Sequence, residues 1–315
     1  MNSPRRTYPL AAFVLFLIAL YALLVALGVV PTGIQDLAGR AWPALLVLAG
    51  LAIVLRGRVP FSRVIALAVT AAVAGGIGLI AFQSQASQPS DATQQAIQQP
   101  IPPDLALLRV RIDALAADVQ VVSGLTPESV KGQFTGSAAS RIDIAYEEAP
   151  DRSATLVLTE TRTEGLPPLD QLGRGLLELE LPPDIPLDVQ FVGADGSATV
   201  NLNDVALERL NVNVSGGDLV VTLPAYRPQL VAQGETNGAL TASTGSLTLF
   251  VPGSVAVRLE LDRGGSGIEP QFDSAQYNYL MNDVLVSRAI DSAPFFLTYT
   301  LTGPRGLIRV ESLQG

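Results

Sequence analysis

LLELELPPDIPLDVQF (176–191) aligns without a gap on SLTLFVPGSVAVRLEL (246–261), 70 residues further along the chain. In both segments apolar and polar residues alternate, a proline follows and the alternation resumes, as in two half-buried β-strands. LVVTLP (219–224) repeats the first half. A repeated strand–proline–strand unit predicts stacked rungs, as in a β-solenoid; the alternative is that generic alternating strands align by chance. The aligned pairs are Leu177/Leu247, Leu179/Leu249, Leu181/Val251, Pro182/Pro252, Ile185/Val255, Leu187/Val257, Val189/Leu259 and Phe191/Leu261.

The same two-residue period extends on both sides of this repeat. It is clear in 108–113, 209–214 and 219–223, and glycines such as Gly216-Gly217 and Gly245 mark turns between the runs. No long helical pattern occurs after residue 103. We therefore predict that 104–315 is a repetitive all-β domain of stacked strands.

A polar segment precedes this domain. Residues 83–103 (QSQASQPSDATQQAIQQPIPP) contain seven Gln, three Ser, four Pro and one charged residue. Such a composition cannot bury enough apolar surface to fold, which predicts a flexible linker. As a coil, 21 residues would reach about 25 Å.

Three apolar segments come before the linker, at 10–30, 41–55 and 64–82. The first and third are long enough to cross a hydrocarbon core of about 30 Å as helices. The second has only 15 residues and needs flanking arginines to reach the membrane surface; the alternative is a re-entrant or interfacial segment. The sequence thus predicts an α-helical transmembrane region of three spans over 1–82, followed by the β domain.

The distribution of charge predicts the orientation. Residues 1–82 hold six Arg and one acid, a net charge of +5, whereas 83–315 hold 14 basic and 28 acidic residues, a net charge of −14. The arginines precede span one and lie between spans two and three, which favours the cytoplasm for both segments. With three crossings the protein is a multi-pass protein of the bacterial cell membrane and its β domain is extracytoplasmic; without the second, the β domain is cytoplasmic. The acidic β domain excludes nucleic acid as a partner.

Span three carries small residues four apart, at Ala71/Gly75, Ala72/Gly76 and Ala74/Gly78. This spacing lets helix backbones approach closely. It predicts either a homo-oligomer or partner contact through span three, or packing against the chain's own spans.

The chain has no Cys and no His. This excludes zinc fingers, thiol chemistry and histidine base catalysis. Candidate catalytic groups are Ser129/Lys131 and the acid pairs Glu147/Glu148 and Glu178/Glu180, but solvated surface explains the acid pairs better. Candidate calcium ligands are Asp188, Asp195 and Asp204 near Gly-rich turns, but the similar turn at 264–269 lacks the Asp that calcium-binding repeats require. We predict no catalytic, cofactor-binding or metal-binding residues, no cofactor and no enzymatic activity.

Three segments resemble the LiaF-like family of bacterial membrane proteins: AWPALLVLAGLAIVLRGR (41–58), LRVRIDALAADVQVVSG (108–124) and LERLNVNVSGGDLVVTLP (207–224). The resemblance implies a toastrack-like β domain. It also implies a non-enzymatic regulator or sensor of envelope stress that acts through protein contacts on a sensor histidine kinase or another membrane protein. The alternative function is a tethered extracytoplasmic structural or adhesive β module that binds cell-wall polymers or other cells.

Overall fold

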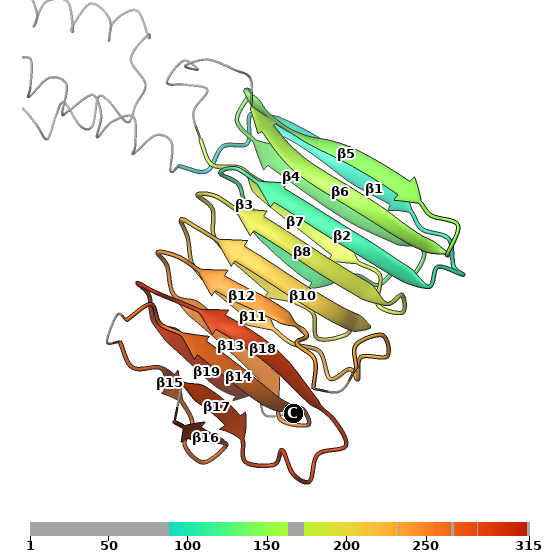
Figure 1. Ribbon diagram of the computed structural model, residues 1–315. Coiled ribbons are helices and arrows are strands. Elements are labelled where there is room, and N and C mark those ends of the chain that lie inside the picture. The colour runs from blue at the N-terminus through green and yellow to red at the C-terminus, as the bar shows by residue number, and fades with distance from the viewer. Residues whose placement is uncertain (1–87, 163–172, 233, 266–267, 282, 314–315) are drawn as a thin grey trace, which may run out of the picture. The chain divides into compact units, whose positions relative to one another are not determined.

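The computed structural model describes residues 88–162, 173–232, 234–265, 268–281 and 283–313 (Figure 1). The three predicted spans and the first part of the predicted linker lie outside these residues. Among the residues described, the search for a helix with the length and hydropathy of a membrane span finds none. The described part is all-β.

Two large sheets contain all the named strands. In spatial order the nine-stranded sheet contains β1 (Thr93–Pro100), β4 (Ser129–Gly136), β7 (Leu176–Leu181), β3 (Asp118–Ser123), β9 (Ala198–Asn201), β11 (Leu219–Thr222), β13 (Leu247–Pro252), β19 (Ile308–Leu313) and β15 (Gln271–Phe272). The ten-stranded sheet contains β16 (Tyr277–Leu280), β17 (Val284–Ser287), β14 (Ala256–Asp262), β18 (Phe296–Thr302), β12 (Gly238–Ala242), β10 (Leu207–Val214), β8 (Leu187–Gly193), β2 (Leu107–Ala114), β6 (Ser153–Arg162) and β5 (Ser140–Glu148).

The two sheets face each other and the chain alternates between them, so that each rung contributes one strand to each sheet (Figure 1). The rungs β8–β9, β10–β11 and β12–β13 follow one another in chain order with parallel pairing. Toward both ends of the stack the spatial order of the rungs departs from the chain order. The rung β6–β7 lies outside β2–β3, and β18–β19 is inserted between β12–β13 and the rung formed by β14 and β15, which we call the β14 rung. Antiparallel strands (β1, β4 and β5 at one end, β16 and β17 at the other) complete the stack.

The internal repeat corresponds to real strands of the stack. The two aligned segments form β7–β8 and β13–β14, and each joins the last strand of one rung, in the nine-stranded sheet, to the first strand of the next rung, in the ten-stranded sheet. One row of directly paired residues in the nine-stranded sheet runs Leu177, Val119, Ala198, Leu219, Leu247 and Ile308, and therefore includes the aligned pair Leu177/Leu247. A row in the ten-stranded sheet runs Leu158, Ile112, Phe191, Val212, Leu240, Leu301 and Leu261, and includes Phe191/Leu261. The predicted stacking of strands is confirmed.

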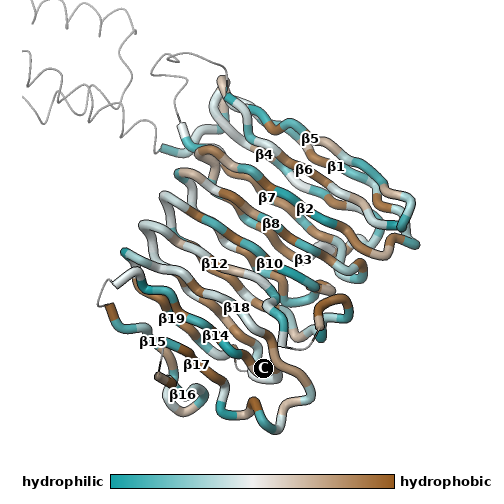
Figure 2. Tube along the Cα trace, viewed as in Figure 1, coloured by the Kyte–Doolittle hydropathy of each residue, from teal (hydrophilic) through white to brown (hydrophobic). Residues whose placement is uncertain are grey.

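The core lies between the sheets. Along each strand the buried apolar residues alternate with outward polar ones, which Figure 2 shows as alternating colours along the tube. The residues of both rows above are at most 6% exposed. Because each rung buries its apolar side chains on the neighbouring rungs and on the opposite sheet, the core is one continuous stack.

The predicted linker is wrong over its second half. Residues Thr93–Pro100 form β1, which pairs antiparallel with β4 over its whole length. This polar segment is ordered by a few contacts that its composition does not reveal: Ile97 and Ile101 are buried, and the Gln95 side chain bonds the backbone of β5. Its Nε2 donates to the Ile142 carbonyl at 2.7 Å, and its Oε1 accepts from the Ile142 N–H at 3.1 Å. The β domain therefore begins well before residue 104.

We predict that a fragment beginning at residue 104 is less stable than one beginning at residue 88, by about 2 kcal/mol. The shorter fragment loses the buried Ile97 and Ile101, and each buried isoleucine contributes about 1.5–3 kcal/mol before the cost of ordering the strand. It also leaves the edge of β4 unpaired, which favours aggregation. Urea unfolding of the two fragments measures the difference; equal midpoints and equal solubility would contradict the role given to β1.

Candidate binding face

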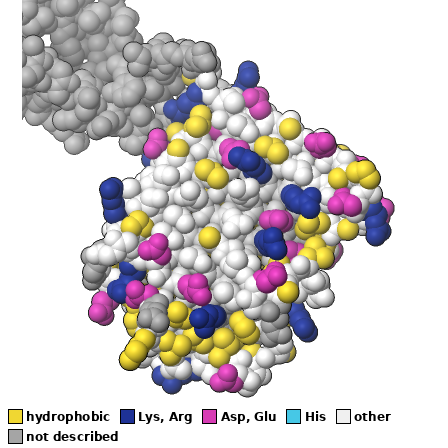
Figure 3. Space-filling model, in the orientation of Figure 1, with side chains coloured by type: hydrophobic (Ala, Val, Ile, Leu, Met, Phe, Trp, Pro, Cys, Tyr) yellow, Lys and Arg dark blue, Asp and Glu magenta, His cyan; other side chains and the backbone are white. Residues whose placement is uncertain are grey.

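The outer surface of the ten-stranded sheet forms a broad polar face. Over seven adjacent strands, from β6 to β14, the outward residues are mostly Thr, Asn, Gln, Arg and acids, and Figure 3 shows few apolar side chains among them. At about 4.8 Å between strands, seven strands extend over roughly 29 Å. We call the polar side chains of this surface the polar face; Val157 and Val192 also point outward among them. The polar face comprises Thr155, Thr159, Arg109, Arg111, Asp113, Asp188, Gln190, Arg209, Asn211, Asn213, Thr241, Thr298, Thr300, Thr302, Arg258, Glu260 and Asp262.

This polar face has no net charge. Its four arginines balance its four acids, whereas residues 83–315 as a whole carry a net charge of −14. These charges form two ion pairs, each within one strand: Arg111 with Asp113 at 2.9 Å and Arg258 with Glu260 at 3.7 Å. The face can therefore meet a neutral or acidic polymer without the repulsion that the rest of the domain would impose.

One row of the polar face brings a carboxylate between two arginines. Arg109 on β2 and Arg209 on β10 both lie directly opposite Asp188 on β8. The two arginines are two strand spacings apart, about 10 Å. Asp188 is partly buried, yet its carboxylate accepts no hydrogen bond and joins no ion pair within the described part of the chain. The row thus presents an acceptor flanked by donors, all open to a ligand.

Neighbouring side chains hold Arg109 in place. Its Nη1 donates to the Ser153 Oγ at 2.9 Å, and that hydroxyl in turn donates to the Asp151 Oδ1 at 2.7 Å. The hydrogen bonds from Ser153 lower the pKa of Asp151, so this carboxylate stays ionised and keeps the network in place. Arg209 has only a long contact of 4.0 Å with Glu235. Arg109 is therefore oriented before any ligand binds, and Arg209 is free to adapt.

The environment of Asp188 opposes its charge. Burial raises its pKa above the ordinary value, although Arg209 and Arg109 act in the opposite direction. Desolvation outweighs the two nearby positive charges, so the ionised carboxylate costs stability. A carboxylate that costs stability and has no hydrogen bond or ion pair within the described residues is a candidate for a binding role.

We predict that Asp188→Asn stabilises the domain at neutral pH, by up to about 0.5 kcal/mol, the scale of a surface substitution. Because the pKa is higher in the folded state, the wild-type penalty is absent below the unfolded-state pKa of about 3.9 and grows as pH rises through the folded-state pKa. The gain from the substitution should therefore vanish at about pH 3. Thermal unfolding at pH 3 and pH 7 measures it, and a variant that is less stable at pH 7 would contradict this account.

The loop between β11 and β12 borders the polar face beside Arg209. The buried Glu208 carboxylate accepts hydrogen bonds from the Gln229 N–H, the Leu230 N–H and the Tyr226 hydroxyl, at 2.7–3.1 Å. Burial, with the neighbouring Glu208 charge, raises the pKa of Tyr226 to about 12, so the hydroxyl remains a donor at neutral pH. The loop is fixed by these bonds and leaves Leu230 58% exposed at its tip.

The groups considered from sequence do not assemble into a catalytic or metal site within the described residues. Lys131 Nζ donates to the Thr126 hydroxyl at 3.0 Å, and no hydrogen bond joins it to Ser129. Glu178 and Glu180 lie exposed on the outer face of β7, as expected for solvated surface. The described residues contain no group of three or more acids able to hold a metal ion.

The Arg109–Asp188–Arg209 row is not predicted by the sequence pattern. All three residues occupy polar positions of alternating strands, but they lie up to 100 residues apart in the chain. Only the pairing register between rungs would show that these three residues are neighbours in space. That register depends on the reversed order of β2–β3 and β6–β7, which the repeat does not encode.

No protein-family model and no curated protein sequence matches the chain. A search of solved structures finds a candidate cell adhesion protein from Clostridium sporogenes ATCC 15579, with 13% identity and a TM-score of 0.59 over 70% of this chain and 100% of that chain. The fold is shared. A candidate adhesin from Bacteroides fragilis NCTC 9343 also matches, with 12% identity and a TM-score of 0.24 over 71% of this chain and 99% of that one. At 13% identity, the likeness to the Clostridium sporogenes protein shows a shared fold alone.

Proposed function

We propose that the chain is a membrane-tethered, non-enzymatic β module that lies outside the cytoplasm and binds a polysaccharide of the cell envelope or of a neighbouring cell surface. The observation that carries this proposal is the polar face without net charge, on which Asp188 lies between Arg109 and Arg209 and accepts no hydrogen bond from the described residues. The likeness in fold to a candidate cell adhesion protein supports the same function.

The chemistry of the polar face suits a hydroxyl-rich chain. Sugar hydroxyls can donate to the Asp188 carboxylate, while ring, hydroxyl or amide oxygens can accept from the two guanidinium groups. The outward Thr and Asn side chains of β6, β10, β12 and β18 can do both. A polymer lying across the strands would meet similar groups at successive rungs, so many weak contacts would add up.

Retention of residues 88–315 on purified cell wall from the native host tests the proposal. Residues 89–167 and 173–315 form one compact unit with its own core, so the fragment can be studied without residues 1–87. We expect the wild type to be retained and Asp188→Asn to bind about tenfold more weakly, the effect of losing roughly 1.4 kcal/mol of hydrogen bonding. The control Glu178→Gln, on the outer face of the other sheet, should bind like the wild type.

Two results would contradict this function. One is the absence of wild-type retention on walls and on isolated wall polysaccharide. The other is equal retention of Asp188→Asn and Glu178→Gln, which would move binding away from the polar face. Envelope-stress regulation, implied by the resemblance of 41–58, 108–124 and 207–224, stays a separate prediction. It requires that deletion of the protein changes stress transcripts under cell-wall antibiotics.

A further inference from the structure

The end of the stack formed by β15 and β16 exposes apolar side chains. We call Ile268, Phe272, Tyr279, Leu280 and Met281 the apolar tip. Met281 is 92% exposed, Leu280 47%, Tyr279 41% and Ile268 38%. Single exposed apolar residues are ordinary, but a contiguous group at one end of a domain marks an interaction surface.

The apolar tip coincides with open strand edges. β15 and β16 are the outermost strands of the two sheets at this end, and within the described residues β16 pairs only with β17. The rings of Phe272 on β15 and Tyr279 on β16 stack with 5.8 Å between their centres and close the end of the core between the sheets. Along the outer edge of β16 the Tyr277 N–H already donates to the Asp273 carbonyl at 3.0 Å, whereas no backbone hydrogen bond within the described residues is formed by Tyr279 at this edge, which leaves its N–H and C=O to pair with another strand.

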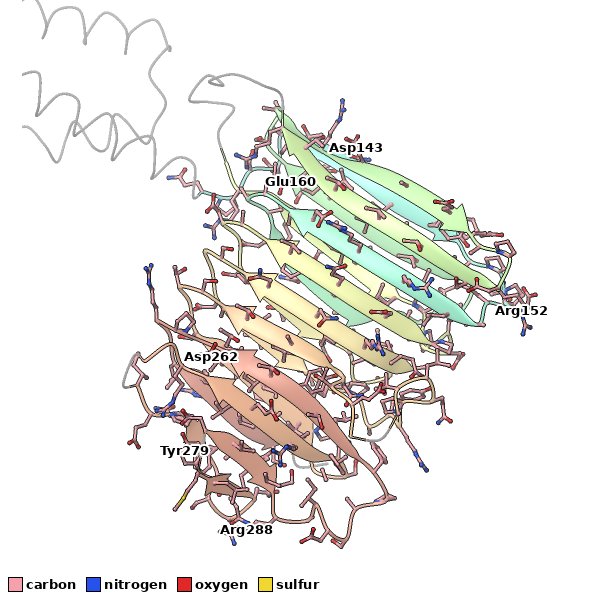
Figure 4. All side chains as sticks on the ribbon, in the orientation of Figure 1. Asp143, Arg152, Glu160, Asp262, Tyr279 and Arg288 are labelled. Carbon is pink, nitrogen blue, oxygen red and sulfur yellow. The ribbon has the colours of Figure 1, made fainter. Side chains whose placement is uncertain are left out.

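The opposite end of the stack is built differently. There the outermost strands are β1, which carries four glutamines, and β5, whose exposed residues include Arg141, Asp143, Glu147 and Glu148. Figure 4 shows Asp143 and Tyr279 at opposite ends of the stack. Charged and polar edges of this kind resist pairing, and head-to-tail stacking would press charges against the apolar tip. The described part of the chain begins at residue 88, shortly before β1, so the apolar tip is at the opposite end of the stack from this first described residue.

Charge favours contact between two copies at the tip. Around it lie Arg263, Arg288, Glu269, Asp273 and Asp283, a net charge of −1, whereas residues 83–315 carry −14. Arg263 and Asp283 form an ion pair with 2.6 Å between Nη2 and Oδ1, and the Tyr279 hydroxyl donates to Asp283. Two copies of this acidic domain therefore repel each other only weakly at the tip, compared with the strong repulsion expected from the domain's net charge of −14.

We infer that the apolar tip is a self-association surface on which β16 of one copy pairs antiparallel with β16 of a second copy. A two-fold axis brings the same patch of both copies together, so the open edge and the apolar side chains of each copy are covered at once. Pairing would join the two ten-stranded sheets and bury Leu280 and Met281. This contact uses neither Asp188 nor the polar face, and it is independent of the proposed polysaccharide binding.

The absence of cysteine makes a clean test possible in the full-length protein. Asn278→Cys places one thiol on exposed β16, and Glu147→Cys places one on exposed β5 at the other end of the stack. After treatment of membranes with a short bismaleimide, we expect Asn278→Cys to give at least fivefold more dimer than Glu147→Cys. Adding Leu280→Lys and Met281→Lys to Asn278→Cys should return the yield to that of Glu147→Cys.

Three outcomes would overturn the inference. The first is equal dimer yield for Asn278→Cys and Glu147→Cys. The second is a yield that Leu280→Lys and Met281→Lys do not lower, which would place the contact elsewhere, for example in 64–82. The third is crosslinking of Asn278→Cys to a different protein in place of a second copy. Polysaccharide retention of residues 88–315 by the wild type and by Leu280→Lys is expected to be equal, so failure of either proposal can be told from failure of the other.

Discussion

Replacing Gly245 with alanine is expected to lower the free energy of unfolding by about 3 kcal/mol or more. Gly245 belongs to a column of turn glycines on successive rungs, Gly196, Gly217, Gly245 and Gly306. A Cβ at Gly245 would overlap the carbonyl oxygen of Gly217, and a Cβ at Gly306 would overlap that of Gly245. The obstacle is backbone that two sheets hold rigidly, so the rung spacing itself would have to increase. Overpacking of this kind costs about 1–3 kcal/mol where side chains can move, and more where they cannot.

Gly253→Ala is the matched control for this prediction. Gly253 also lies in a turn next to a strand of the nine-stranded sheet, but the nearest atom to an added Cβ is the Leu313 carbonyl oxygen at 3.3 Å. We expect this variant to lose less than about 1 kcal/mol in urea unfolding. Equal losses for Gly245→Ala and Gly253→Ala would mean that the close stacking of turns does not limit the residue at position 245.

Glu160→Ala should cost about 3–5 kcal/mol. The Glu160 carboxylate is 2% exposed, and its Oε2 accepts from three successive backbone N–H groups of the β2–β3 turn, those of Leu115, Ala116 and Ala117, at 2.7–3.0 Å (Figure 4). Removing it leaves three donors without a partner, and each buried unpaired group costs about 1–3 kcal/mol. Glu160 belongs to β6 and the turn belongs to the adjacent rung. The substitution therefore also removes a contact between two rungs that are neighbours in space but not in chain order.

Glu160→Gln distinguishes the contribution of the hydrogen bonds to stability from that of the negative charge. The amide oxygen of Gln can still accept from the turn, so we expect a loss of about 1–2 kcal/mol, less than half that of the alanine variant. Glu178→Ala, on the exposed outer face of β7, should change stability by no more than about 0.5 kcal/mol. If Glu160→Ala and Glu178→Ala unfold at the same urea concentration, the turn does not depend on this carboxylate.

Much of the fold follows from the sequence because each rung carries its own pattern. Alternation around residues such as Leu177, Leu179 and Leu249 identified strands, and the 70-residue offset identified rungs that share a register. What could not be predicted is the order in space. β18–β19 is inserted between β12–β13 and the β14 rung, although nothing in the local pattern distinguishes these strands from their neighbours.

The features that the sequence did not predict, namely β1, the buried acids and the Asp188 row, have one physical property in common. β1 contains a single buried apolar residue, Ile97, and it is held in place by Gln95, a side chain that composition counts as polar and solvated. Glu160 and Glu208 occupy positions on the core side of their strands, where an acid is costly unless donors from another part of the chain surround it. The Asp188 row likewise exists only through pairing between rungs. Each of these features depends on contacts between distant residues, which local periodicity does not report.

Accessibility of the polar face in living cells tests the central claim most directly. Gln190→Cys places the only thiol of the chain on the polar face, and Glu178→Cys places it on the outer face of the other sheet. A membrane-impermeant maleimide would be applied to intact cells, to cells stripped of their wall and to lysed cells. We expect both positions to react without lysis, and Gln190→Cys to react several-fold faster once the wall is removed, whereas Glu178→Cys should react equally with and without the wall. Labelling of both positions only after lysis would place the β domain in the cytoplasm and contradict the account, and identical behaviour of the two positions in walled and stripped cells would contradict binding through the polar face.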